Sequence, residues 1–426
     1  MKFIVIGITD QPHPYFPPEV MEVISGGRVF SGGKRHHEIM APLLPDGAEW
    51  IDIVVPLDAV FRRYAQHFSR QSAPIIVFAS GDPLFFGFAN TIQRKLPDAQ
   101  VVVYPAFNSL QMLAHRLVMP YHDLRIVSLT GRPWQEFDRA LIERAPKIGV
   151  LTDREHTPAS IARRMLDYGF GYYEMSVGEH LGNPAAEVVS TLALSEAAQS
   201  HFAHPNCLIL TKTAEASPMQ KKESRQPEHR LFGIPEGDFA LLDGREKMIT
   251  KMPVRLLSLQ ALDLPRRHVL WDIGFCTGSV SIEARLLFPH LHVVSFEVRP
   301  ECEAIIHENA RRFGAPGIEV HIGDFLSAAC HDIVAASSRP DAVFIGGHGG
   351  HLSDIMAKVK AWLSPGGVIV MNSVSSAVVD RMTARPSSRQ LFDEACRSLG
   401  LVQHPPLHIT LNDFNPIEIL KCELPS

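Results

Sequence analysis

A glycine-bearing turn lies between a strand-like apolar segment, residues 269–273, and a segment of helical period, residues 280–287. The turn is made of Gly274, Phe275, Cys276, Thr277 and Gly278. Such a turn at the carboxyl end of a strand can bind a cofactor, because glycine lets the ligand approach the backbone and the following helix presents free N–H groups. The pattern therefore predicts a cofactor site, although plain packing of the strand against the helix would also account for the glycines.

Two acidic residues stand where the next two strands are expected to end. Glu297 lies 19 residues after Gly278. A carboxylate at that position can accept hydrogen bonds from both hydroxyls of a ribose. Asp324 follows the apolar segment 318–322. A carboxylate there can accept a hydrogen bond from the amino group of an adenine. The turn and the two carboxylates, in this order, indicate an adenosine-binding site.

The composition of the turn favours S-adenosylmethionine over a dinucleotide. A dinucleotide fingerprint needs a second glycine so that the backbone can approach the pyrophosphate, and Cys276 stands at that position. Asp272 opens the pattern Asp-x-Gly-x-x-Thr-Gly-Ser, which contains no further glycine. This pattern suits a ligand without a pyrophosphate.

A second glycine–acid pair occurs in the first half of the chain. Gly81 and Asp82 follow the apolar segment 75–79 and precede a segment that is expected to be helical. Gly81 permits close approach of the backbone, whereas Asp82 can either cap the helix or hold a ligand cation. The pair alone does not decide between these two roles.

The 426 residues predict about three domains, at roughly 150 residues each. Strand-like and helical segments alternate up to residue 212, which indicates two α/β lobes, expected at 1–113 and 114–212. Residues 213–230 carry almost no apolar side chain and are predicted to form a solvated linker. Alternating strands and helices over 231–426 predict a doubly wound sheet with its own core.

The composition excludes several classes of protein. Lys and Arg number 41 against 46 Asp and Glu, and the net charge of −5 disfavours a general grip on nucleic acid. The longest apolar runs have strand length, so no membrane span is expected. The six cysteines show no CxxC spacing, and neither disulfides nor a metal site are predicted. The N-terminus has no cleavage site of a signal peptide, and we expect a cytoplasmic protein.

Residues 231–426 resemble the C-terminal half of the precorrin-6Y C-5,15-methyltransferase (decarboxylating) family of vitamin B12 biosynthesis. The segments that carry the resemblance are 231–235, 249–251, 270–274, 308–314 and 341–347. It implies a Rossmann-like class I methyltransferase domain. It also implies S-adenosylmethionine contacts from Thr250, Asp272, residues 274–278, Glu297, Asp324 and Phe325. Cys276 departs from the glycine usual in the family, which affects how the methionine end of the ligand is held.

Residues 1–212 resemble the tetrapyrrole methylases. The segments that carry this resemblance are 32–36, 78–87, 105–111, 128–132 and 177–182. It implies two α/β lobes with S-adenosylmethionine between them, contacted by Gly81, Asp82, Asn108 and Ser109. The family places a glycine-rich loop after the first strand, whereas this chain has a stiff segment with four prolines at residues 12–18. How this loop would meet a macrocycle stays open.

The two resemblances together imply a fusion of two methyltransferases, each with its own S-adenosylmethionine site, that act on precorrin-6B or its cobalt complex. The N-terminal part would methylate ring carbon 5. The C-terminal part would methylate ring carbon 15 with loss of carbon dioxide from the ring C acetate, to give precorrin-8 or its cobalt form. Positioning is the main catalytic need, so no strong base is required and no catalytic residue is assigned.

Charged residues within or beside the shared segments are candidates for further roles. The carboxylates of a tetrapyrrole need cations, and the candidates are Lys34, Arg35, Arg132, Lys251 and Arg255. Solvated surface charge is the alternative for each of them. His348 and His351 are candidates for the proton donor of the decarboxylation, with ordinary surface or packing positions as the alternative.

Two other functions remain open at this point. The chain could methylate another small molecule or RNA, although its negative charge weighs against RNA. It could also bind S-adenosylmethionine without turnover, although Glu297, Asp324 and Gly81 weigh against this. No nucleic acid and no membrane are expected as partners. A homo-oligomer is implied by the resemblance alone, and the presence of cobalt in the substrate is not decided by the sequence.

Overall fold

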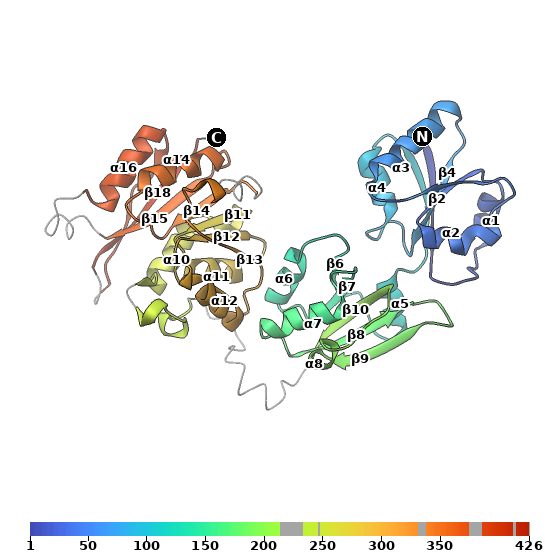
Figure 1. Ribbon diagram of the computed structural model, residues 1–426, viewed down its shortest axis with the longest axis horizontal. Helices are drawn as coiled ribbons and strands as arrows, with labels where there is room; N and C mark the ends of the chain where they lie inside the picture. Colours follow the sequence, from blue (N-terminus) through green and yellow to red (C-terminus); the bar gives the residue numbers. More distant parts are fainter. Residues whose placement is uncertain (214–232, 246–247, 331–337, 375–385, 412–414, 426) are drawn as a thin grey trace. The chain divides into compact units, whose positions relative to one another are not determined.

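The computed structural model describes residues 1–213, 233–245, 248–330, 338–374, 386–411 and 415–425. The chain forms two compact units (Figure 1). The first comprises residues 1–133, 145–164 and 172–215, and the second comprises 134–144, 165–171 and 216–426. Within the predicted linker only Thr213 belongs to the described residues. The predicted domain boundaries therefore stay predictions.

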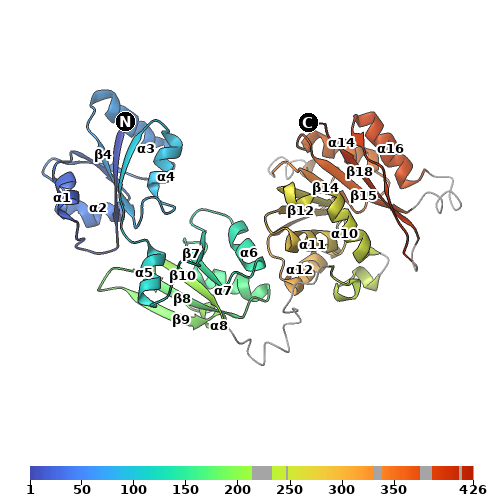
Figure 2. The same ribbon diagram turned by 180° about the vertical axis from the view of Figure 1, so that it is seen from behind.

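The first unit begins with a parallel sheet in the order β3-β2-β4-β1-β5. Its strands are β1 Lys2–Ile8, β2 Val29–Gly32, β3 Glu49–Asp52, β4 Ile75–Ser80 and β5 Gln100–Tyr104. One face is covered by α1 (Pro18–Ser25) and α2 (Lys34–Met40), and the other by α3 (Asp58–Arg70) and α4 (Phe88–Lys95) (Figure 2). Burial on both faces explains the continuous apolar run in β4, and all five carboxyl ends meet at one edge.

A second sheet follows in the order β6-β7-β10-β8-β9. Its strands are β6 Arg125–Ser128, β7 Lys147–Leu151, β8 Tyr173–Glu179, β9 Val188–Ala193 and β10 Asn206–Lys212. The helices of this stretch are α5 Ser109–Arg116, α6 Gln135–Ile142, α7 Pro158–Asp167 and α8 Leu194–Ala197. β10 runs antiparallel to both β7 and β8. Because α5 packs against β7 and β10, it crosses the lobe boundary predicted between residues 113 and 114.

The second unit contains a sheet in the order β13-β12-β11-β14-β15-β18-β16, with β17 paired to β18. Its strands are β11 Val269–Ile273, β12 His292–Glu297, β13 Ile318–Ile322, β14 Ala342–Ile345, β15 Val368–Val374, β16 Val402–Gln403, β17 Leu407–Ile409 and β18 Ile417–Glu423. The strands from β11 to β15 are parallel, and the strand order reverses between β11 and β14. This reversal is the switch point of a doubly wound fold, and the predicted fold class is confirmed.

Helices cover both faces of this sheet. α10 (Met252–Ala261) and α11 (Ser279–Leu287) pack around Leu270 on one face. α14 (Leu352–Trp362) and α16 (Ser388–Leu399) pack around Trp271 on the other, and α12 (Glu301–Phe313) packs against α11. Short 3₁₀ turns are Ala41–Leu43, Glu236–Asp238, Leu242–Gly244 and Leu264–Arg266. Over the described ranges, no helix has the length and apolarity that crossing a bilayer requires.

A buried ion pair joins α10 to α11. The side chains of Arg255 and Glu283 are 0% and 2% exposed, and Arg255 Nε donates to Glu283 Oε2 at 2.5 Å. Arg255 also donates to the carbonyl of Thr250 at 2.8 Å, and Glu283 accepts the backbone N–H of Ile234 at 3.2 Å. The structure thus opposes the predicted role of Arg255 in binding substrate carboxylates, because this guanidinium is enclosed and already paired.

Removing one partner of this pair is expected to destabilise the second unit strongly, since a buried charge is left without compensation. We expect Glu283→Ala to lower the free energy of unfolding by about 3–5 kcal/mol, measured by chemical denaturation of the full chain. The control is Glu308→Ala, which removes the exposed partner of Arg312 and should cost less than about 1 kcal/mol. Equal effects of the two substitutions would contradict a structural role for the buried pair.

Candidate functional site

The turn after β11 lies between the ends of β12 and β14 and is hydrogen-bonded to both sides. The Gly274 N–H donates to the Phe296 carbonyl at 2.7 Å, and the Gly346 N–H donates to the Ile273 carbonyl at 2.8 Å. Gly274 has φ +76°, and a Cβ there would lie 2.7 Å from the Gly347 nitrogen. Only glycine fits this close approach. The turn therefore sits at the switch point, where doubly wound folds bind their ligands.

Two polar atoms at this turn are buried and have no hydrogen-bond partner in the part of the chain that the structure describes. Asp272 Oδ2 accepts from the Ser281 hydroxyl at 2.5 Å, whereas Asp272 Oδ1 has no hydrogen-bond partner among the described residues. The same holds for Thr277 Oγ1. Buried polar atoms in proteins are nearly always hydrogen-bonded, so these two indicate a polar ligand. Burial raises the pKa of Asp272 to about 7, against hydrogen bonds from Ser281 that lower it, and a cationic group nearby would favour the ionised form.

Glu297 lies beside the turn at the end of β12 and is almost completely buried. It accepts the Cys276 N–H at 3.0 Å and the Val298 N–H at 2.9 Å. Arg299 adds a forked pair of bonds, with Nε and Nη2 at 3.0 and 2.8 Å from the two carboxylate oxygens. Burial opposes ionisation, but the bonds from Arg299 and the Cys276 amide hold the pKa of Glu297 below its usual value. The carboxylate is thus ionised and aimed at the turn.

Arg299 is a residue of this site that the sequence pattern did not reveal. A carboxylate offers about four lone-pair positions, and Glu297 already accepts from three backbone N–H groups and the two guanidinium donors. Ribose hydroxyls can reach Glu297 only by replacing some of these bonds. The side chain of Arg299 is 34% exposed, so its forked pair is the one that can open.

Cys276 has a backbone conformation that favours glycine. Its φ is +50°, which is strained for a residue with a Cβ. Its side chain packs with Leu242, Cys302 and Ile306, and burial raises the pKa of the thiol. The thiol side chain therefore fills volume at the turn, in a backbone conformation that is strained for it.

The other residues of this domain that were predicted to contact the ligand or the substrate differ in burial. Asp324 is exposed at the end of β13, where its Oδ1 accepts the Leu326 N–H at 2.9 Å. Phe325 is buried in an aromatic cluster, with ring centroids 6.1 and 5.1 Å from those of Trp271 and Phe296. Lys251 is half-buried and Thr250 accepts from Arg255. Asp324 shares the carboxyl edge of the sheet with Glu297, whereas Phe325 serves packing.

In the first unit, the ends of β4 and β5 approach closely. Gly81 has φ +61°, and a Cβ there would lie 2.9 Å from Asn108 Cα. Asn108 caps α5 by accepting the Gln111 N–H at 2.9 Å, and Ser109 is the first residue of that helix. The structure thus brings together the predicted residues Gly81, Asn108 and Ser109.

Of the two roles left open for Asp82, the structure excludes the helix cap. Asp82 Oδ1 accepts the Leu84 N–H at 2.9 Å, so the side chain closes a local turn. α4 begins only at Phe88, with Gly87 as its N-cap. An aspartate two residues before its N–H partner satisfies an Asx turn as readily as a helix terminus. A role of Asp82 toward a ligand stays a prediction.

A cavity of about 710 Å³ opens beside these strand ends. Its lining includes Gly7, Thr9, Asp82, Tyr104, Phe107 and Gln111, together with Tyr15 and Phe16 of the proline-bearing loop. Phe107 and Tyr15 are 58% and 85% exposed, so broad aromatic surfaces border the opening. The loop that replaces the glycine-rich segment thus forms part of this wall. Such a wall suits a large, flat, partly apolar ligand.

Charged groups form a network next to this cavity. Arg35 lies 3.2 Å from Asp10, and Asp10 lies 3.1 Å from His180 Nδ1. Arg35 Nη2 also donates to Ser80 Oγ at 3.0 Å, and His36 Nε2 is 2.9 Å from the same oxygen. Burial lowers the pKa of His36 to about 4. Arg35, a predicted substrate ligand, is thus held in place beside a neutral imidazole.

The two remaining predicted cations of this half differ in their surroundings. The guanidinium of Arg132 lies over the ring of Phe86, 5.2 Å from its centroid, and donates to Ser128 Oγ at 2.8 Å. Lys34 is exposed at the start of α2. The geometry therefore fixes Arg132 in one position, whereas Lys34 is surrounded by solvent.

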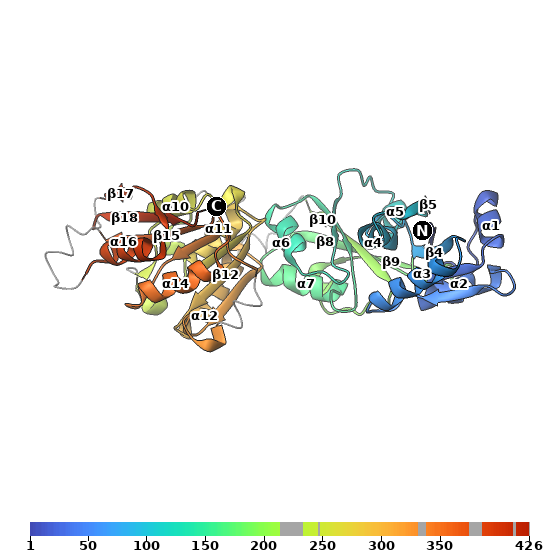
Figure 3. The ribbon, with the colours of Figure 1, turned by 90° about the horizontal axis from the view of Figure 1, so that it is seen from above.

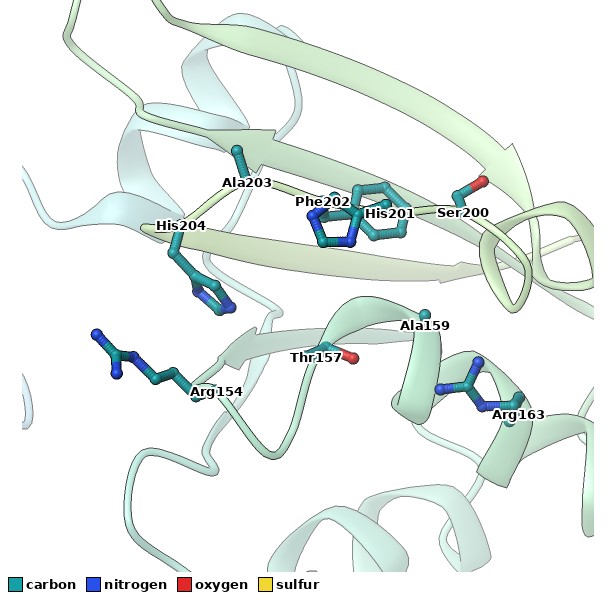
Figure 4. Close-up of a pocket in the computed structure, with 9 residues that line it drawn as sticks. All are labelled: Arg154, Thr157, Ala159, Arg163, Ser200, His201, Phe202, Ala203 and His204. Atoms are coloured by element: carbon teal, nitrogen blue, oxygen red, sulfur yellow. The ribbon is translucent and has the colours of Figure 1, made fainter.

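A second cavity, of about 580 Å³, lies next to the start of α7 (Figure 4). Its charged and ring-nitrogen side chains are Arg154, Arg163, His201 and His204. Arg163 donates to the carbonyl of Ala198 at 2.7 Å. No residue predicted from the sequence lines it. Its walls come from α7 with the residues just before it and from residues 200–204, far along the chain, so no local sequence pattern predicts it.

Two family models match the chain. The model of the tetrapyrrole (corrin/porphyrin) methylases matches residues 2–197, and the model of the precorrin methyltransferase domain matches residues 243–388. The two matches lie on either side of the predicted linker.

This chain is similar to relatives that match most of its length and to shorter relatives that match one half of it. The precorrin-6Y C(5,15)-methyltransferase [decarboxylating] of Sinorhizobium sp is 32% identical over 87% of this chain and 84% of its own length. The cobalt-precorrin-6B C(15)-methyltransferase (decarboxylating) of Salmonella typhi is 38% identical over 44% of this chain and 94% of its own. The cobalt-precorrin-7 C(5)-methyltransferase of Salmonella typhimurium is 28% identical over 42% and 84%, respectively.

Binding of S-adenosylmethionine should depend on the ionisation of Asp272. The pKa of this carboxyl is raised to about 7 by burial, so it is neutral at lower pH, and the ionised form binds a cationic ligand better. We expect affinity to rise with pH between about 5.5 and 7.5, by at most about tenfold per unit, with proton release on binding. Titration calorimetry in buffers of different ionisation enthalpy measures the affinity and the number of protons released. Asp272→Asn should remove this component, and an unchanged pH profile in that variant would contradict it.

At position 276, glycine should be more stable than alanine, which carries a Cβ. We expect Cys276→Gly to be more stable than Cys276→Ala by about 1 kcal/mol, because only the glycine variant escapes the strain of a positive φ. Chemical denaturation of the two variants gives the difference. Comparing glycine with alanine keeps the loss of the thiol equal in both. Equal stability of the two would show that the turn relaxes to another conformation.

Proposed function

The chain belongs to the family of decarboxylating precorrin-6Y C(5,15)-methyltransferases, and on that premise we propose that it methylates ring carbons 5 and 15 of precorrin-6B or its cobalt complex, with loss of carbon dioxide from the ring C acetate. The product is precorrin-8 or its cobalt form. The observation that carries the proposal is a pair of buried atoms, Asp272 Oδ1 and Thr277 Oγ1, that have no hydrogen-bond partner among the residues that the structure describes, at a glycine turn beside Glu297.

These residues fit S-adenosylmethionine, which supplies an electrophilic methyl group on a sulfonium. In the second unit, Glu297 accepts ribose hydroxyls in exchange for Arg299, and Asp324 accepts from the adenine. Asp272 and Thr277 take the polar methionine end. Because this turn admits no side chain at Gly274, the ligand lies against the backbone, which fixes its orientation. Holding the methyl group and the ring carbon in attack geometry is the main contribution that these residues make.

We place a separate S-adenosylmethionine site in the first unit, at Gly81, Asp82, Asn108 and Ser109. The aromatic-walled cavity of about 710 Å³ beside it is proposed to hold the macrocycle. Arg35 and Arg132 lie in held positions and are proposed to bind acetate or propionate groups, since a guanidinium binds a carboxylate in bidentate geometry. Lys34 and Lys251 are weaker candidates for the same role. We also propose that the protein is a cytoplasmic homo-oligomer and that it binds neither nucleic acid nor membranes.

The test is the mass of the product after anaerobic incubation of the purified chain with S-adenosylmethionine and precorrin-6B, and separately with its cobalt complex. The proposal expects a gain of two methyl groups and a loss of one carbon dioxide. The substrate that reacts identifies whether cobalt is already present. Binding of S-adenosylmethionine without any change in either substrate would replace the proposal by a non-catalytic role.

Single alanine substitutions should separate the two sites. Gly81→Ala places a Cβ 2.9 Å from Asn108 Cα, and Gly274→Ala places one 2.7 Å from the Gly347 nitrogen, so each closes its own turn. We expect Gly81→Ala to add one methyl group and release carbon dioxide. Gly274→Ala should release no carbon dioxide. Product masses give the answer, and loss of both methylations in both variants would contradict independent sites.

A further inference from the structure

A series of contacts runs along the carboxyl edge of the third sheet, away from the ligand turn. Gly274 packs against Gly347, which precedes His348. His348 Nε2 lies 3.2 Å from Ser388 Oγ at the start of α16, and Arg389 follows in the sequence. Substrates of doubly wound folds bind outside the carboxyl ends of the strands. The first turn of α16 therefore borders the region where the substrate of this domain lies.

A buried carboxylate lies at this edge. Glu418 of β18 is the register partner of Ser373 near the end of β15, and its side chain is 3% exposed. Its Oε1 accepts from Arg389 Nη1 at 2.8 Å, whereas its Oε2 has no hydrogen-bond partner within the described part of the chain. A buried carboxylate that is only half satisfied destabilises a fold. Its presence here is better explained by function than by stability.

His408 faces Glu418 across the ladder of β17 and β18. The two are register partners, and His408 Nδ1 lies 3.2 Å from Glu418 Oε1. The two groups form an ion pair when the imidazole is protonated, and Nε2 is the second nitrogen of the ring, on the side away from Nδ1. The side chain of His408 is 64% exposed, so Nε2 can meet both a substrate and water. Figure 3 shows β17, β18 and α16 close together in the second unit.

We propose that His408 is the proton donor of the decarboxylation and that Glu418 is its positioning residue; this inference rests on the proposed function. The C–C bond of the ring C acetate breaks, carbon dioxide leaves, and the electron pair enters the conjugated macrocycle, which is the electron sink. The proton on Nε2 of His408 then goes to the exocyclic carbon and converts it to a methyl group. Water returns a proton to the imidazole. One carboxylate and one proton thus become carbon dioxide and one C–H bond.

Protonation makes the cleavage irreversible, because the electron-rich carbon can otherwise recapture carbon dioxide while both remain in the site. The carboxylate of Glu418, 3.2 Å from Nδ1, stabilises the charged imidazole. Arg389 balances the charge of Glu418. The histidines predicted from the sequence are less suited to this role. Burial lowers the pKa of His348, so it is largely neutral, and His351 is an exposed side chain 3.9 Å from Asp354.

The experiment compares full-length wild type with His408→Ala under anaerobic single-turnover conditions, using the substrate that wild type accepts. Product mass counts the methyl groups gained and the carboxyl groups lost in the same molecule. We expect methyl transfer to carbon 15 to change less than about threefold and carbon dioxide release to slow by about 100-fold or more. Because His408 is exposed on an edge strand, the variant should fold as wild type does.

The matched control is His404→Ala. His404 Nε2 lies 3.3 Å from Glu423 Oε2, which is also a histidine–glutamate pair against β18. Glu423 is paired with Val368 at the start of β15, so this pair lies at the opposite end of the strand from the substrate edge. We expect decarboxylation at the wild-type rate. Wild-type rates in both histidine variants would overturn the proposal while leaving the proposed function intact.

Glu418 provides a second, independent measurement. Glu418→Gln keeps the shape of the side chain and removes its charge, so carbon dioxide release should slow by about tenfold in an otherwise active enzyme. The same substitution should have no further effect in a His408→Ala background, and Glu418→Asp should recover part of the rate. Full additivity of the two substitutions would overturn the positioning role. If wild type gains no methyl group and loses no carbon dioxide, the proposed function fails, and this inference fails with it.

Discussion

The close approach of backbone segments at the carboxyl edges of the parallel strands is the constraint on which both sites depend. At Gly274 the turn after β11 lies against Gly347, and at Gly81 the end of β4 lies against Asn108. Neither contact leaves room for a Cβ. The ligand-facing surface at these points is therefore main chain, and the chemistry must come from neighbouring side chains such as Glu297 and Asp272. A fold that loosened these contacts would misplace every one of those side chains.

The strands that bracket the turn could be predicted closely from the sequence. β11, β12 and β14 are short and almost entirely buried, because both faces of the parallel sheet are covered there. β13, at the edge of the sheet, is half-buried and carries Glu319 and His321 between its apolar residues. β2 and β9 were not predicted. β2 is only four residues long and contains Ser31 and Gly32, and β9 is largely exposed, so neither shows a strong apolar pattern. Strands of this kind are defined by their hydrogen-bonded neighbours and not by their own composition.

In the candidate site too, some residues could be placed from the local sequence and others could not. Glu297 and Asp324 follow strands at the expected positions, so their placement is a local property of the chain. Arg255 and Asp82 are different, because a sequence shows that a group is charged but not whether a distant partner or a nearby N–H already uses it. The pairing of His408 with Glu418 depends on the register of two strands, and the fork of Arg299 on Glu297 depends on a side-chain rotamer. Neither leaves a pattern in the sequence.

The position of β18 in the third sheet has a consequence for biosynthesis. All strands of the first two sheets precede residue 213, so that part of the chain can close its sheets while synthesis continues. Among the described strands, β15 has no antiparallel neighbour until Ile417–Glu423 has left the ribosome, and β16 and β17 pair only with that strand. The two halves of the enzyme thus mature at different times. Until then the exposed edge of β15 is a surface on which a nascent chain is open to chaperones and to aggregation.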